Sequence, residues 1–189
     1  MGHSRAAKAD THARIVNIAS RKLREEGLAG VGVADVMEEA GLTVGGFYKH
    51  FASREDLIRE ALDDACGAWQ ARAAAAEAGG PPLSFKSLVD DALSTRHRDN
   101  PGMGCPVAAV AAEIARGDES TRALFSERLD RNIELLASLI HAKDKKTARA
   151  KAIATYAAMS GAVIMARVAN DDAFSREILK AVADQLQRD

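Results

Sequence analysis

The chain has 189 residues, of which 47% are hydrophobic and 4% aromatic, enough for one mid-sized domain or for one domain with a small lobe attached. Alanine, the strongest helix former, is abundant, which predicts an all-α fold. The formal net charge of −1 excludes a protein that is basic throughout. The sequence shows no secretory signal and no apolar run long enough to span a bilayer, so we expect a cytoplasmic protein. Its two cysteines, Cys66 and Cys105, are then expected to be reduced.

Basic residues gather near the start of the chain. Up to residue 24 the only acid is Asp10, whereas the basic residues are Arg5, Lys8, Arg14, Arg21, Lys22 and Arg24. Such local asymmetry attracts phosphate even when the total charge is near zero. The alternative is an ordinary solvated tail, and charge alone does not decide between the two.

About nine helices and no strands are predicted in chain order from apolar residues at three- and four-residue spacing, from capping residues and from glycine stops. The expected helices cover residues 10–26, 33–40, 43–50, 53–78, 84–98, 106–117, 118–141, 144–169 and 171–187. The fourth is long enough to bend near Gly67, and the segment Gly79-Gly80-Pro81-Pro82 ends it.

The second and third helices form a helix-turn-helix by their spacing, with Gly41 at the corner. The third helix contains Gly45 and Gly46, each of which weakens an isolated helix by about 1 kcal/mol. Glycines at such a cost suggest that another surface, such as a DNA groove, comes close to the backbone. The core is expected to hold Val36, Leu42, Phe47 and Phe51, which leaves the side chains between them exposed.

The stretches "RIVNIASRKLREEG" and "VADVMEEAGLTVGGFYKHFASREDL" resemble the N-terminal domain of the TetR family of one-component transcriptional regulators over about a quarter of the chain. The resemblance implies a helix-turn-helix that binds DNA. The positions that it assigns to DNA contact are Arg14, Thr43, Val44, Gly45, Gly46, Tyr48, Lys49 and His50. Two alternatives remain: Tyr48 as a cap on the small helical core, and His50 as a structural histidine bonded to a carbonyl.

Two positions depart from the family pattern. Val31 and Gly32 stand where relatives often carry a hydroxyl that caps the second helix and touches phosphate. Val44 stands where relatives are often basic; valine can pack on a thymine methyl group but cannot read guanine. The operator sequence therefore cannot be copied from a relative.

The resemblance divides the chain into a DNA-binding domain at residues 1–52 and a ligand-binding and dimerisation domain at residues 53–189. One recognition helix covers few base pairs, so a twofold dimer is expected. The last two helices, with small residues at Ala154, Ala157, Ala158, Ser160, Gly161 and Ala162, are predicted to form a four-helix bundle with their copies. The alternative is that they belong to a purely intramolecular core.

In the family the middle helices enclose a cavity for a small-molecule effector. The candidate lining residues are Trp69, Met103, Cys105, Phe125, Leu129, Tyr156 and Met159, each of which could equally be an ordinary core residue. Pro106 places Cys105 at a helix N-cap, where the dipole favours a thiolate. The "MGCPVAAVAAE" stretch resembles one at this point in part of the family, some members of which sense oxidants or electrophiles through a cysteine.

The prediction is thus a homodimeric repressor that binds a palindromic operator and is released by a small apolar or electrophilic effector. The alternatives are a thiol sensor through Cys105, a regulator driven by a protein partner, and an enzyme with Cys105 as nucleophile and His97 as base. The enzyme has little support, since no acid, oxyanion element, metal or phosphate motif is evident. No catalytic residue, metal site or cofactor is predicted.

Overall fold

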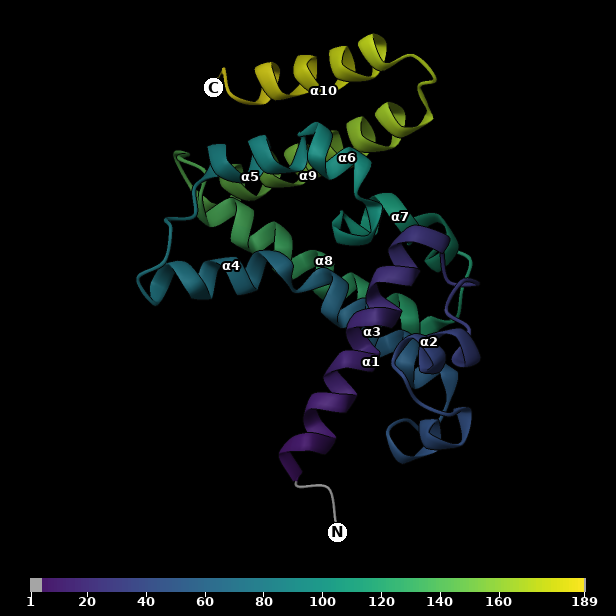
Figure 1. Cartoon of the computed structure of the whole chain (residues 1–189). Coiled ribbons are helices and arrows are strands. Elements are labelled where there is room, and N and C mark those ends of the chain that lie inside the picture. Colours follow the sequence, from purple (N-terminus) through teal and green to yellow (C-terminus); the bar gives the residue numbers. More distant parts are fainter. Residues whose placement is uncertain (1–4, 189) are drawn as a thin grey trace.

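The computed structural model describes residues 5–188, and in these it contains ten α-helices, two 3-10 helices and no strand (Figure 1), which confirms the all-α prediction. The α-helices are α1 (Arg5–Glu26), α2 (Val33–Glu39), α3 (Arg54–Cys66), α4 (Ala68–Glu77), α5 (Phe85–Ala92), α6 (Thr95–Asp99), α7 (Pro106–Ile114), α8 (Glu119–Ser138), α9 (Lys145–Val168) and α10 (Asp172–Leu186). The 3-10 helices are η1 (Val44–Lys49) and η2 (Pro101–Met103). None of the described helices is long and apolar enough to cross a membrane.

Three predicted helices differ from those observed. The long fourth helix divides at Gly67, which ends α3 and begins α4. The fifth divides at Ser94, whose side chain accepts a hydrogen bond from His97 N and so caps α6. The recognition helix is a 3-10 helix, and the two glycines in it explain why an α-helix is not sustained there.

A first hydrophobic core joins the N-terminal helices. α1 contributes Ile15 and Leu23, and α3 contributes Leu57 and Leu62, all fully buried or nearly so. The same core reaches into α8 through Phe125. The packing is therefore continuous across the predicted boundary at residues 52 and 53, which stays a prediction, and the outer bounds at residues 1 and 189 lie outside the described residues.

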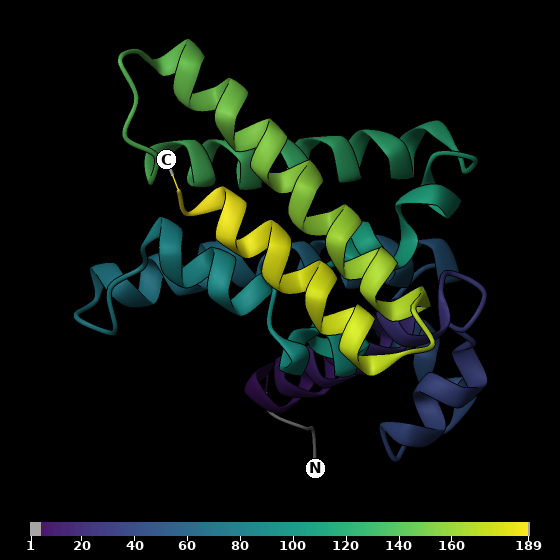
Figure 2. The ribbon, with the colours of Figure 1, turned by 90° about the horizontal axis from the view of Figure 1, so that it is seen from above.

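A second core joins α5, α8, α9 and α10. Its fully buried side chains include Leu88, Leu136 and Val163. α9 and α10 pack against each other and run in opposite directions at one end of the molecule (Figure 2). The N-terminal helices lie at the other end (Figure 1). The fold thus separates the helix-turn-helix from the last two helices.

Candidate functional site

The corner of the helix-turn-helix depends on Gly41. Its φ of +70° lies in the left-handed region that favours glycine, and Leu42 N donates to Met37 O at 2.8 Å to close the turn. Leu42 is half-buried against the first core rather than fully buried. The turn directs η1 away from α2 and so presents it at the surface.

η1 is anchored on one side and open on the other. Phe47 and Phe51 are buried, as predicted, and their rings stack at 5.4 Å. Tyr48 is 74% exposed and touches Phe47 only edge-on, which does not support its role as a core cap. Thr43 begins the helix, and its side chain makes no capping hydrogen bond. A phenol and a threonine hydroxyl are therefore both available at this surface.

The two glycines of η1 are not required by the fold. Neither has a positive φ. A Cβ at Gly45 would meet nothing within 4 Å, and one at Gly46 would meet only the Met37 side chain, at an ordinary 3.5 Å. Neither the backbone conformation nor the neighbouring atoms therefore demand glycine at these two positions.

His50 lies beside a small basic cluster. It is half-buried, and its Nδ1 is buried without a hydrogen-bond partner among the described residues, so the carbonyl bond expected for a structural histidine is not seen there. Burial lowers the pKa of His50, and the charges of His12, Lys8 and Lys49 lower it further. Lys8 was not predicted as a site residue; its charge beside the predicted site was the available signal.

The basic stretch of α1 is only partly free. Arg21 forms ion pairs with Glu25 and Glu39, and Lys22 forms longer ones with Glu26 and Glu39. Three basic residues of α1 remain exposed: Arg5, Lys8 and Arg14. The positive charge expected from the sequence is therefore confined to the first half of the helix.

The departures at Val31 and Gly32 have a structural explanation. Val31 is fully buried in the first core. Gly32 caps α2 without a side-chain bond, and a Cβ there would come within 2.8 Å of the Asp35 carboxylate. That carboxylate already occupies the helix N-terminus, where the dipole favours negative charge.

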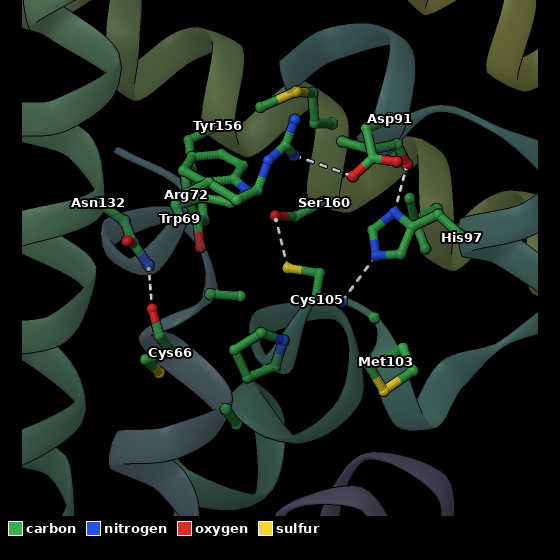
Figure 3. A pocket seen from close by; sticks show the side chains of 17 residues that line it. Cys66, Trp69, Arg72, Asp91, His97, Met103, Cys105, Asn132, Tyr156 and Ser160 are labelled. Carbon is green, nitrogen blue, oxygen red and sulfur yellow. Dashed lines mark hydrogen bonds and ion pairs between the residues drawn. The ribbon is translucent and has the colours of Figure 1, made fainter. Parts of the chain in front are cut away.

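A second candidate site is a partly open cavity of about 110 Å³, lined by residues of α3 to α9 and of η2 (Figure 3). Five of the seven predicted lining residues surround it: Trp69, Met103, Cys105, Tyr156 and Met159. Met103 stands at its edge and is 78% exposed. The polar lining residues that the sequence did not indicate are Arg72, Asp91, His97, Asn132 and Ser160.

Phe125 and Leu129 do not line this cavity, so their prediction was wrong in position. Phe125 turns into the first core, and Leu129 packs against the second. α8 instead presents Asn132 to the cavity. Helical spacing alone does not show which face of a long helix meets which core.

Cys105 caps α7 and Pro106 follows at its first position, as predicted. The Cys105 backbone N–H donates to His97 Nε2 at 2.8 Å, and His97 Nδ1 lies 2.5 Å from Ala92 O. His97 therefore carries its proton on Nδ1 and binds backbone groups through both nitrogens. The Cys105 Sγ lies instead 3.8 Å from Ser160 Oγ. Both nitrogens of His97 are thus engaged by backbone groups, so the ring is not placed as a base for the Cys105 thiol. The hypothesis of a cysteine-dependent enzyme therefore has no geometric support.

The engagement of His97 gives a prediction for stability. Burial lowers the pKa of His97, and the charge of Arg167 adds to this. Above about pH 6.5 the ring is neutral in the folded and unfolded chains alike, so its full contribution to the free energy of unfolding is present. Below that pH the unfolded chain takes up the proton first, and the free energy of unfolding falls until the pH passes the folded pKa. Urea denaturation between pH 5 and 8 should show this slope.

The control for this pH series is an exposed histidine. His97→Gln should flatten part of the slope, whereas His141→Gln should leave it unchanged. Equal slopes in the wild type and in His97→Gln would contradict a lowered pKa of His97 in the folded chain.

The cavity and the helix-turn-helix are linked by hydrogen bonds. Arg24 of α1, which is 9% exposed, donates through Nε to Gly102 O at 2.7 Å. Gly102 precedes four consecutive residues that line the cavity, Met103 to Pro106. A second bond joins Leu28 N to the Glu113 carboxylate of α7 at 3.0 Å. A displacement of the loop beside the cavity would therefore act directly on α1.

A helix-turn-helix with an exposed recognition helix defines a DNA-binding protein. Comparison with known proteins identifies the class further. The profile described as "Bacterial regulatory proteins, tetR family" matches residues 15–61, and that of the "Transcriptional regulator LmrA/YxaF-like, C-terminal domain" matches residues 81–185. The chain belongs to the TetR family of transcriptional regulators, which confirms the resemblance.

Individual relatives agree with this assignment. An HTH-type transcriptional regulator of Mycobacterium tuberculosis, Rv0196, is 33% identical over 172 residues, which cover 84% of each chain. TtgR of Pseudomonas putida is 37% identical over 54 residues, 29% of this chain and 26% of TtgR. The reduced form of Escherichia coli NemR shares the fold, with a TM-score of 0.74 at 19% identity over 94% of this chain and 95% of NemR. A TetR-family regulator of Cytophaga hutchinsonii has a TM-score of 0.75 at 19% identity, over 98% of this chain and 96% of the other.

Proposed function

We propose that the protein is a homodimeric repressor that binds a palindromic operator and is released when a small molecule occupies the cavity. The observation that carries the first part is the pair of glycines in η1, because neither their backbone conformation nor any neighbouring atom in the described part of the chain requires glycine there. The observation that supports the second is the hydrogen bond from Arg24 to the loop that lines the cavity. The predicted division near residue 52 separates the two activities.

The proposed DNA contacts fall into two kinds. Thr43, Tyr48, Lys49 and the α1 residue Arg14 would bind phosphate, since each presents an exposed donor. Within the groove, the backbone of Gly45 and Gly46 would approach the bases, with Val44, 50% exposed, against a thymine methyl group. His50 would join the phosphate contacts together with Lys8.

A gel-shift assay on the intergenic region beside the gene, at several salt concentrations, tests the proposal. A specific shift that weakens steeply with salt supports it. The absence of a specific shift at every salt concentration would refute the proposed DNA-binding role for this operator region.

Lys49→Ala is expected to weaken operator binding at all sequences alike and to reduce the slope of log K against log salt by about 1, because one phosphate contact is lost. Lys49 is exposed, so folding should be unaffected. Lys143→Ala removes an exposed lysine far along the chain from η1 and is the matched control. An unchanged slope in Lys49→Ala would contradict the assigned contact.

The dimer proposal rests on the exposed side of α9 and α10. Among the described residues, five of the eight large hydrophobic side chains that remain exposed lie on these two helices: Ile153, Ile164, Met165, Val168 and Phe174. Ala157 and Gly161 lie along the same side of α9, and a Cβ at Gly161 would meet nothing within 4 Å. Ser160 and Ala162, also predicted for the interface, are buried within the chain instead.

A thiol sensor is the second candidate, and the position of Cys105 favours it. The residue caps α7, lines the cavity and is only partly buried. Reaction of its thiol with an electrophile would place a covalent group in the cavity. Cys105→Ser should then abolish the release of DNA by an electrophile while ordinary operator binding continues; persistent release would exclude this residue as the sensor.

A further inference from the structure

The cavity is small enough to restrict its occupant. Its volume of about 110 Å³ is slightly below that of an engineered apolar cavity of about 150 Å³ that binds benzene. One wall is aromatic, because Trp69 and Tyr156 meet edge-on with ring centroids 5.2 Å apart. The size and this wall suit a single flat ring.

The cavity carries no net charge. Among the described residues that line it, the only formal charges are those of Arg72 and Asp91, which form an ion pair at 3.0 Å. His97 is neutral because both ring nitrogens bind backbone groups. Burial raises the pKa of the Cys66 thiol to about 12 and raises that of Tyr156 well above its usual value. A charged ligand would therefore lose its hydration without gaining an unpaired counter-ion.

The polar groups of the cavity converge from three elements. Ser160 on α9 and Cys105 at the start of α7 point into the space from opposite sides, 3.8 Å apart at Oγ and Sγ (Figure 3). The Asn132 amide on α8 donates to Cys66 O at 3.3 Å, and its Oδ1 is buried with no hydrogen-bond partner in the described part of the chain. A ligand oxygen that could donate and accept would find partners here.

We propose that the cavity binds an uncharged molecule of about one ring that carries a hydroxyl or carbonyl oxygen. The ring lies against Trp69, and the oxygen lies near Ser160 and Cys105. This inference rests on the proposed function, because it names the chemical class of the effector. It requires no covalent step and therefore also distinguishes an ordinary ligand from the thiol reaction.

Trp69 is the one tryptophan of the chain and lies in the cavity wall, so its fluorescence reports binding directly. Four probes of similar size separate charge from polarity: benzyl alcohol, toluene, benzoate and benzylammonium. We expect saturable quenching by benzyl alcohol in the full-length protein, with the two ions at least about tenfold weaker. The proposal would be overturned if benzoate or benzylammonium bound as tightly as benzyl alcohol. It would also be overturned if neither neutral probe showed saturable binding.

Ser160→Ala tests the polar contact. It should weaken benzyl alcohol about three- to tenfold, the range for one hydrogen bond, and leave toluene unchanged. Ser138→Ala, an exposed serine on α8, is the control. Equal losses for both probes would contradict the assigned contact. The gel-shift assay is independent of the probe titration. If the protein binds the operator but prefers the charged probes, only this inference is refuted. If it binds the neutral probes but gives no specific shift, only the proposed function is refuted.

Discussion

Val168→Glu is expected to produce a folded monomer whose affinity for the operator is lower by at least about a hundredfold. A dimer holds its second recognition helix at a high effective concentration, which raises affinity by about 10²- to 10⁴-fold without new contacts. Val168 is 79% exposed at the end of α9, so a carboxylate there costs the isolated chain little. At a twofold interface the substitution places two carboxylates in an apolar contact.

Analytical sedimentation measures the oligomeric state of the Val168→Glu protein, and titration with operator DNA measures its affinity. Ala75→Glu introduces the same charge on the exposed side of α4 and should change neither the mass nor the affinity. The circular dichroism of all three proteins should agree. A Val168→Glu protein that remains dimeric would place the interface elsewhere than on the apolar side of α9 and α10.

The N-terminal half of the fold was predictable because its signals are local. The glycine at the corner and the phenylalanines four residues apart each fix one feature, and Phe47, Phe51 and Gly41 behave as expected. What the sequence did not show is the 3-10 geometry of η1, which depends on how the two glycines weaken the helix.

The cavity was less predictable because its walls come from distant segments. Aromatic and sulfur-containing residues gave a useful signal for Trp69, Tyr156 and Met159. The same signal misplaced Phe125, since the rotation of α8 about its axis is set by packing on both cores. Polar lining residues such as Asn132 carry no local signal, although they determine which ligands can be bound.

The dimer surface shows a similar division. Small residues along α9 predicted close packing, but part of that stripe is used inside the chain, where Ser160 and Ala162 are buried. The exposed hydrophobic residues Ile164, Met165 and Val168 share the open side of α9 with the other part of the stripe, Ala157 and Gly161. Only the packing of α9 against α8 and α10 determines which face remains open.

Arg24→Met is expected to preserve operator binding and to suppress its response to the effector. Allosteric coupling in proteins amounts to about 1–3 kcal/mol, and one hydrogen bond from a charged group is worth about 1.5–3 kcal/mol. The bond from Arg24 Nε to Gly102 O can therefore carry most of the coupling between the cavity and α1. Methionine keeps much of the buried volume and removes a charge whose burial already lowers the pKa of Arg24.

The measurement is the ratio of operator dissociation constants with and without the compound that releases the wild-type protein. This ratio should fall at least about fivefold in Arg24→Met and further when Glu113→Gln weakens the second link to Leu28. Lys22→Met, on the same helix but paired only with surface carboxylates, should keep the wild-type ratio. If Arg24→Met responds like the wild type, the cavity must act on the helix-turn-helix by another route, such as the packing of α3 or α7 against α1.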